Sequence, residues 1–138
     1  MAVYKIFPEK DATLYSLYPT ANTGLDEIIE ATITPPEQVL ISTSPQASRF
    51  LIQFSQDEIT QISSSLASGS SMLSASLKCY AANVTGVGGQ TIVDVHAVSG
   101  SWDNGTGKYG DVPAVTNGVS WQYRTAYGEN PWSCLLYT

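Results

Sequence analysis

Hydrophobic and polar residues alternate in several short stretches of this chain, a period of two that is typical of half-buried β-strands. The clearest stretch is Ser48–Phe54, in which Phe50, Ile52 and Phe54 fall on one face. Because this is the most apolar strand in the sequence, the pattern predicts that this face lies at the centre of the hydrophobic core.

Two further alternating stretches, Leu73–Tyr80 and Thr91–Val98, flank a glycine-rich segment that suits a turn. We therefore expect them to form a hairpin. The residues predicted to face inward are Ala75, Leu77, Cys79, Val93, Val95 and Ala97. In the second strand, Asp94 and His96 fall on the opposite, solvated face.

The N-terminal part predicts strands within residues 3–18 and 27–33. They are separated by a turn cluster, Pro19–Gly24, and Pro35-Pro36 ends the second, because proline cannot donate to a strand ladder. Several short strands at this spacing indicate an all-β fold.

The period changes after Phe54. Ser55-Gln56-Asp57-Glu58 matches a capping box, and Ile59, Ile62 and Leu66 follow at helical spacing, with Gly69 placed to end the helix. We expect one short helix that covers an edge of the sheets. The predicted fold is a single domain over residues 1–138: an antiparallel β-sandwich, jelly-roll-like, with one short helix.

Composition excludes several classes of partner. The chain has 6 Lys+Arg against 12 Asp+Glu, a net charge of −6, and no basic stripe. Because nucleic acids and anionic membranes are bound chiefly through basic residues, neither is an expected partner. No apolar run approaches the roughly 20 residues of a membrane span. No secretory signal is recognised at the N-terminus, so synthesis in a cytoplasm is expected.

The two cysteines, Cys79 and Cys134, make neither a disulfide framework nor a metal cluster. Cys79 falls within a predicted strand, where we expect a buried free thiol. Nothing in the sequence marks an oxidising compartment that would favour a Cys79–Cys134 bridge.

A series of short motifs resembles the carbohydrate-binding-like β-sandwich family often labelled DNRLRE. The segments that carry the resemblance are Asp11-Ala12-Thr13, Pro19 through Gly24, Arg49 to Phe54, Ala75-Ser76-Leu77, Trp102 through Gly107 and Trp121-Gln122-Tyr123-Arg124. The resemblance covers nearly the whole chain and implies the sandwich fold. Because the motifs are mostly structural, it implies the fold more strongly than any function.

The N-terminal residues carry a narrower resemblance. Lys5–Tyr15 and Asn22–Asp26 are similar to small structural proteins of tailed bacteriophages, particularly those of marine and cyanobacterial hosts. This similarity implies a virion component that is made in the host cytoplasm, with other virion proteins or copies of itself as partners.

The C-terminal residues depart from the family pattern, which continues after its Pro-Trp segment into a further strand. Here Pro131-Trp132 is followed only by Ser133–Thr138. A missing strand leaves an open sheet edge, which proteins cover or use for pairing. We expect the apolar residues of this segment to contact another chain, with folding back over their own domain as the alternative. The predicted interface residues are Trp132, Leu135, Leu136 and Tyr137.

Candidate catalytic and metal-binding residues are few. Asp94 and the only histidine, His96, share a strand face but lack a recognisable nucleophile or metal partner. Asp103 and Asp111, with Asn104, offer oxygen ligands for a structural Ca²⁺, but Asx-turn chemistry explains them without an ion. Paired carboxylates for glycoside hydrolysis would have to come from Asp94, Asp103, Asp111 or Glu129. We therefore predict that the chain is not an enzyme and carries no cofactor or metal.

Aromatic residues surround the Gly-rich loop and are the candidate ligand-binding residues for a glycan or a partner: Trp102, Tyr109, Trp121 and Tyr123. Sugar rings pack on exposed aromatic faces, so these residues suit a stacking platform. The alternative, which the large buried areas of aromatic side chains favour, places Trp102 and Trp121 in the core. Tyr109 and Tyr123 are the better candidates for an exposed surface.

Two functions are consistent with these features. The favoured one is a bacteriophage virion structural or accessory protein, a capsid decoration or a tail or neck component, that acts by docking on other proteins. The alternative is a carbohydrate-binding module for attachment to host surface glycans.

Overall fold

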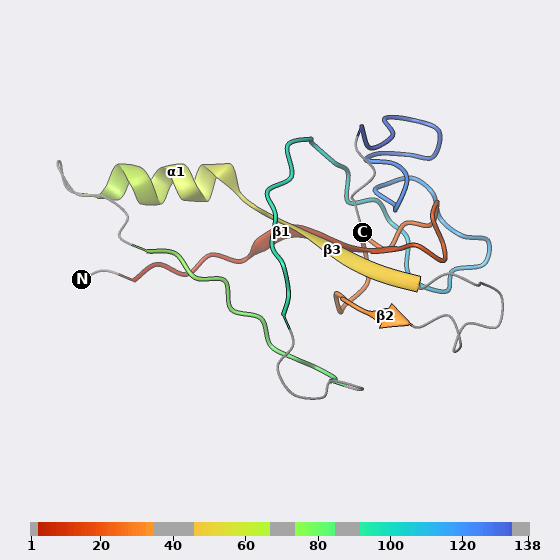
Figure 1. Cartoon of the computed structure of the whole chain (residues 1–138). Helices are drawn as coiled ribbons and strands as arrows, with labels where there is room; N and C mark the ends of the chain where they lie inside the picture. The colour runs from red at the N-terminus through yellow and green to blue at the C-terminus, as the bar shows by residue number, and fades with distance from the viewer. Residues whose placement is uncertain (1–2, 35–45, 67–73, 85–91, 134–138) are drawn as a thin grey trace.

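The structure is a computed structural model that describes residues 3–34, 46–66, 74–84 and 92–133. Its regular elements are β1 (Pro8–Tyr15), β2 (Ile33–Thr34), β3 (Gln46–Phe54) and α1 (Gln56–Ser65). The strands form an antiparallel sheet in the order β1-β3-β2, and α1 follows β3 almost directly (Figure 1). The regular structure of the described residues is therefore antiparallel β-sheet with one short helix.

Strand β3 pairs unequally with its two neighbours. The pairing with β1 runs from Tyr15 opposite Ser48 to Pro8 opposite Phe54, with an irregularity between Pro8 and Lys10. The pairing with β2 joins only Ile33 and Thr34 to the first two residues of β3. Among the described residues, the second edge of β3 is thus covered only at its beginning.

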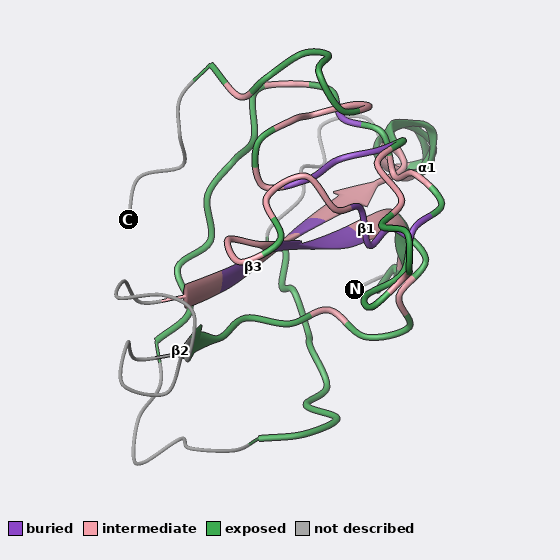
Figure 2. Cartoon of the chain, turned by 90° about the vertical axis from the view of Figure 1, so that its right-hand side faces the viewer, coloured by how far each residue is buried: buried purple, intermediate pink, exposed green. Residues whose placement is uncertain are grey.

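The core lies between β1, β3 and the loops of the C-terminal part. Ala12 and Leu14 alternate on one face of β1, and Leu51 of β3 lies opposite Ala12 on that same face. Trp102 and Val119, both from loops, complete the buried cluster. Figure 2 shows buried residues along β1, in β3 and in the neighbouring loops. The core is therefore a sheet covered by loops in the part of the chain described.

The predicted core face of β3 is wrong. Leu51 is 7% exposed, whereas Phe50, Ile52 and Phe54 on the other face are only half-buried. Phe50 lies opposite Thr13, and the Thr13 side chain is engaged with a polar group on that side, since its Oγ1 accepts the Glu30 N–H (3.0 Å). The buried face of the strand is chosen by what packs against it.

The predicted hairpin of Leu73–Tyr80 and Thr91–Val98 is also not formed in the described residues. Residues 74–84 and 92–99 belong to no strand, and all are exposed; Leu73 and Thr91 lie outside the described part. The predicted strand over 27–33 shrinks to β2. Alternation marks segments that suit a strand, but a strand forms only where a neighbour supplies its hydrogen bonds.

The predicted N-terminus of the helix is confirmed. Ser55 is the N-cap of α1, and its Oγ accepts the Glu58 N–H at 3.4 Å. The helix ends at Ser65, and the expected terminator Gly69 lies outside the described residues. The expected packing over a sheet edge is wrong, since no residue of α1 is buried and the helix extends away from the sheet (Figure 1).

Ser55→Ala should therefore weaken α1 by about 1 kcal/mol, the usual value of an N-cap oxygen. Because α1 buries no residue, we expect faster amide hydrogen exchange over Asp57–Leu66 with little change in melting temperature. Ser63→Ala, at an exposed position of the same helix, is the control and should not speed exchange. Equal exchange in the Ser55 variant and the parent chain would contradict the capping role.

Candidate functional site: a tyrosine-lined pocket

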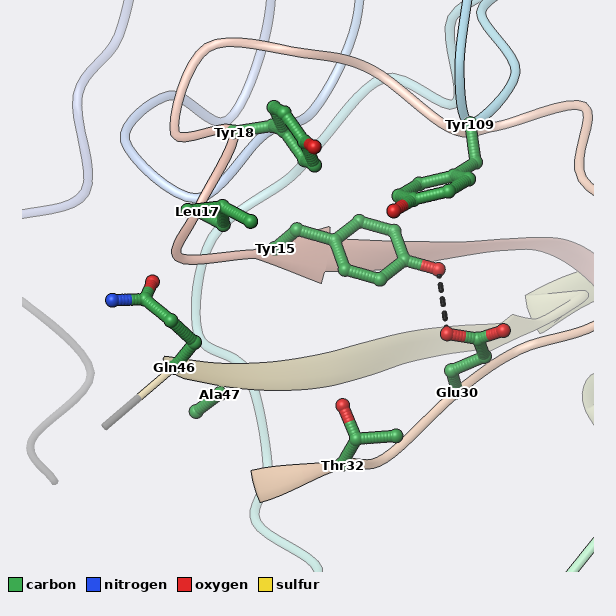
Figure 3. Close-up of a pocket in the computed structure, with 8 residues that line it drawn as sticks. All are labelled: Tyr15, Leu17, Tyr18, Glu30, Thr32, Gln46, Ala47 and Tyr109. Atoms are coloured by element: carbon green, nitrogen blue, oxygen red, sulfur yellow. Dashed lines mark hydrogen bonds between the residues drawn. The ribbon is translucent and has the colours of Figure 1, made fainter. Parts of the chain in front are cut away.

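A pocket of about 170 Å³ lies at the end of β1 (Figure 3). Tyrosine side chains contribute most of its aromatic surface. The Tyr15 and Tyr109 ring centroids are 4.9 Å apart, and the Tyr18 ring meets Tyr109 edge-on at 5.8 Å. The other residues that line the pocket are Leu17, Glu30, Thr32, Gln46 and Ala47.

One carboxylate faces these rings. The Tyr15 hydroxyl donates to Glu30 Oε2 at 2.9 Å (Figure 3). Burial, together with this hydrogen bond to the carboxylate, raises the pKa of Tyr15 above its usual value. Partial burial, with a contribution from Tyr18, likewise raises the pKa of Tyr109. Both phenols therefore stay neutral near pH 7, and Glu30 is the acidic residue among those that line the pocket.

A tight turn after β1 places two of the tyrosines. The Tyr18 N–H donates to the Tyr15 carbonyl at 3.2 Å, and the Ala21 N–H donates to the Tyr18 carbonyl at 3.1 Å. Glu30 is held by its backbone, because its N–H donates to Thr13 Oγ1 and its carbonyl accepts from Ser48 Oγ at 3.1 Å. The carboxylate is therefore fixed beside the last residue of β1.

Tyr109 reaches the pocket from a distant loop. Its backbone N–H donates to Asp26 Oδ1 at 3.0 Å, and the neighbouring Lys108 forms an ion pair with Glu27 at 3.2 Å. The Leu25 N–H donates to the Gly107 carbonyl at 3.0 Å. These contacts join the turn after β1 to the Gly-rich loop and carry the Tyr109 ring, 56% exposed, to the pocket.

Asn22 fastens the same two loops together. Its Nδ2 donates to the carbonyls of Asn104 (2.7 Å) and Val119 (2.9 Å), and its Oδ1 accepts the Gly107 N–H (2.8 Å). A Cβ added at Gly105, whose φ is +77°, would lie 2.3 Å from Asn22 Oδ1. The fully buried Asn22 therefore packs so closely against the Gly-rich loop that position 105 has no room for a side chain.

The predicted ligand-binding aromatics do not share this pocket, because only Tyr109 lines it. Trp102 is 4% exposed and belongs to the core. The Lys10 ammonium lies 4.5 Å from the centroid of its ring and also donates to its carbonyl. Trp102 is therefore a core residue, which is the alternative that the sequence favoured.

Trp121 and Tyr123 lie elsewhere. Trp121 is half-buried against the core, and the Arg49 guanidinium carbon lies 5.0 Å from its ring centroid. Tyr123 is half-buried, and its ring meets the Tyr127 ring edge-on at 5.3 Å. The predicted aromatic residues therefore do not form one stacking platform.

Two of the candidate calcium ligands bond to the backbone of loops. Asp111 Oδ2 accepts the Lys108 N–H at 2.8 Å, and Asn104 Nδ2 donates to the Gly24 carbonyl at 2.6 Å. The Asp103 side chain is exposed. Among the residues described, no group of three or more His, Cys, Asp or Glu side chains is placed to hold a metal ion.

Other sequence candidates lie on exposed chain. His96 and Asp94 are exposed, but so are the residues of 92–99 that were predicted to face inward, so no separate solvated face exists there. Glu129 is exposed in a turn. Cys79 is a free, exposed thiol rather than a buried one, because the strand predicted to bury it is not formed. Cys134 lies outside the described residues. In the described ranges, no helix is long and apolar enough to cross a membrane.

The predicted C-terminal interface falls only partly within the described residues. Trp132 packs against the core of its own chain, and its Nε1 donates to the Ser120 carbonyl at 3.0 Å. For this residue the structure shows a contact with its own domain, and its predicted role in an interface with another chain stays a prediction. Leu135, Leu136 and Tyr137 lie outside the described part.

Sequence reasoning missed every lining residue of the pocket except Tyr109, including its other two tyrosines and Glu30. The spacing of Tyr15 and Tyr18 across a strand end was an available signal, since a tight turn brings both rings to one side. No local pattern identifies Glu30, because its position depends on contacts with Thr13 and Ser48.

Comparisons of the chain with protein-family models, with curated proteins and with solved structures found no match.

Proposed function

We propose that this chain is a structural or accessory component of a bacteriophage virion, a capsid decoration or a tail or neck protein, that acts by protein–protein docking rather than by catalysis. The observation that carries the docking role is the exposure of residues 74–84 and 92–99, here called the unpaired segments. The virion setting rests on the resemblance proposed for Lys5–Tyr15 and Asn22–Asp26, which the comparisons neither support nor contradict.

The unpaired segments expose many large apolar side chains for a single chain in water. These residues are Leu77, Tyr80, Val84, Ile92, Val93, Val95 and Val98. Scattered apolar residues are normal on a surface, but contiguous apolar stretches mark interaction sites. The alternation of these residues with polar ones also suits pairing with another strand.

The proposed occupant of the unpaired segments is a second copy of this chain. Ala47 accepts a hydrogen bond from the β1 side, from the Ser16 N–H, whereas the Ser48 N–H donates to Thr32 on the β2 side. Backbone N–H and C=O groups of alternate residues point to the same edge of a strand. Those of Phe50 and Ile52 therefore point to the same edge of β3 as Ser48, beyond the part that β2 covers. As far as the described residues show, each copy thus offers an open strand edge and strand-like segments, which is what strand addition requires.

Native mass spectrometry of the purified chain, in parallel with proteomics of purified virions, tests this proposal. We expect an oligomer, and Val95→Lys should convert it to a monomer. Val95 is 76% exposed in the single chain, so the lysine should change the stability of the monomer little. Burying the lysine at an interface is unfavourable, so the oligomer should be destabilised.

The matched control is Val112→Lys, at a position that is 94% exposed and outside the unpaired segments. It should leave the oligomer intact. A monomeric parent chain, or equal dissociation by both lysine variants, would overturn the docking surface, and absence of the chain from purified virions would overturn the virion role.

Attachment to host glycans is the alternative, and it is tested on the same preparation with a glycan array. Tyr109 is the candidate aromatic with the most exposed ring. Glycan binding that disappears in Tyr109→Ala, from a folded chain, would favour that alternative function.

A further inference from the structure

We propose that the tyrosine-lined pocket is a binding site for an organic cation, an alkylammonium or guanidinium group. This inference does not depend on the proposed virion role. It rests on the three tyrosine rings, the Glu30 carboxylate and the size of the pocket.

The rings supply the first attraction. A cation near the face of an aromatic ring is attracted by the negative charge density of the ring. Tyr15 and Tyr109 are tilted by 47° and Tyr18 and Tyr109 by 75°, so the rings present differently oriented faces and edges around one space. Figure 3 shows these side chains and Glu30 around the pocket.

Glu30 supplies the second attraction. In the part of the chain described, which contains every lysine and arginine of the sequence, no ion pair joins one of these residues to Glu30. The Tyr15 hydroxyl engages Oε2 of Glu30, which leaves Oε1 to accept from an N–H donor.

The size of the pocket limits the ligand. A volume of about 170 Å³ is smaller than the roughly 300–1,000 Å³ of sites for drug-sized ligands. It suits the head of one side chain or a small amine. An anion is disfavoured because Glu30 would repel it at short range.

The two sources of this chemistry are a free amine and a lysine or arginine side chain of a protein. The test is a titration of the full chain, carrying labelled tyrosines, followed by the ring signals in NMR. The probes are tetramethylammonium and methylguanidinium, with N-acetyl-lysine and N-acetyl-arginine methylamides as models of protein side chains. We expect saturable shifts of the Tyr15, Tyr18 and Tyr109 signals.

The source is read from the relative affinities. Tighter binding of the blocked amino acids than of the small cations identifies a protein side chain as the natural ligand, and the reverse order identifies a free amine. Either order supports the site.

Two variants test the named contacts. Glu30→Gln keeps an oxygen acceptor for Tyr15 but removes the charge, and should weaken binding about fivefold. Tyr109→Ala removes an exposed ring and should weaken binding by a similar factor. Glu129→Gln, at an exposed carboxylate that does not line the pocket, is the charge-matched control and should bind as the parent chain does.

Absence of saturable shifts, or equal affinity in Glu30→Gln and the parent, would overturn the proposal. A neutral methyl glycoside that shifts the same rings at lower concentration than any cation would also overturn it, in favour of a glycan site.

Discussion

Asn22→Ala is expected to destabilise the folded chain by roughly 3–5 kcal/mol, because a buried polar group left without its partner costs about 1–3 kcal/mol. The substitution would remove the partners of the Asn104 and Val119 carbonyls and of the Gly107 N–H. Asn22 is 1% exposed, so water cannot replace these bonds without opening the loops. Because single domains commonly have only about 5–15 kcal/mol of stability, this one change can unfold much of the population.

Denaturant unfolding of the parent chain, of Asn22→Ala and of two further variants tests this expectation. Asn22→Asp preserves the shape but replaces the donating amide by a carboxylate, so it should also be strongly destabilising. The control is Asn117→Ala. Asn117 is exposed and its side chain bonds Thr106, so this change should cost under about 1 kcal/mol. Equal unfolding midpoints for Asn22→Ala and Asn117→Ala would refute the central role of Asn22.

The features that the sequence predicted well are local ones. The N-cap at Ser55 follows from side-chain and backbone groups three residues apart, and the strand character of β1 and β3 follows from short runs of residues. The face of β3 that is buried depends on distant partners. Leu51 is buried because Trp102 and Val119 pack in the same cluster, and no periodicity within Ser48–Phe54 contains that information.

The hairpin was predicted but is not formed, and the pocket is formed but was not predicted. Both errors have the same cause. Alternation in 92–98 is real, but it does not specify which strand edge pairs with the segment or whether that edge lies in the same chain. Tyr109 was identified as a candidate because of its loop, whereas its approach to Tyr15 depends on Asp26 and Leu25 bonding the Gly-rich loop. The predicted turn motifs at Asn22-Thr23-Gly24 and Gly105-Thr106-Gly107 are in fact one packed junction.

Trp102→Ala is expected to cost about 3–5 kcal/mol, the usual effect of truncating a buried aromatic residue in a core. Trp102 packs with Ala12 and Leu14 of β1 and with Leu51 of β3, so its removal leaves a cavity between the sheet and its covering loops. The Lys10 ammonium over the ring would also lose a cation–π contact, worth roughly 0.5–2 kcal/mol. Thermal unfolding followed by circular dichroism measures the combined effect.

Trp121→Ala is the matched control, because Trp121 is only half-buried against the same cluster. It removes the same side chain but less buried surface, and should therefore lower the melting temperature less than Trp102→Ala does. The comparison also separates a core residue from a ligand-binding one. If Trp102 serves only to stabilise the fold, Trp102→Ala should lose ligand binding only to the extent that it loses folded protein. A Trp102→Ala chain that melts like the parent but no longer binds a glycan or a partner would contradict the core role. It would show that Trp102 acts in ligand binding.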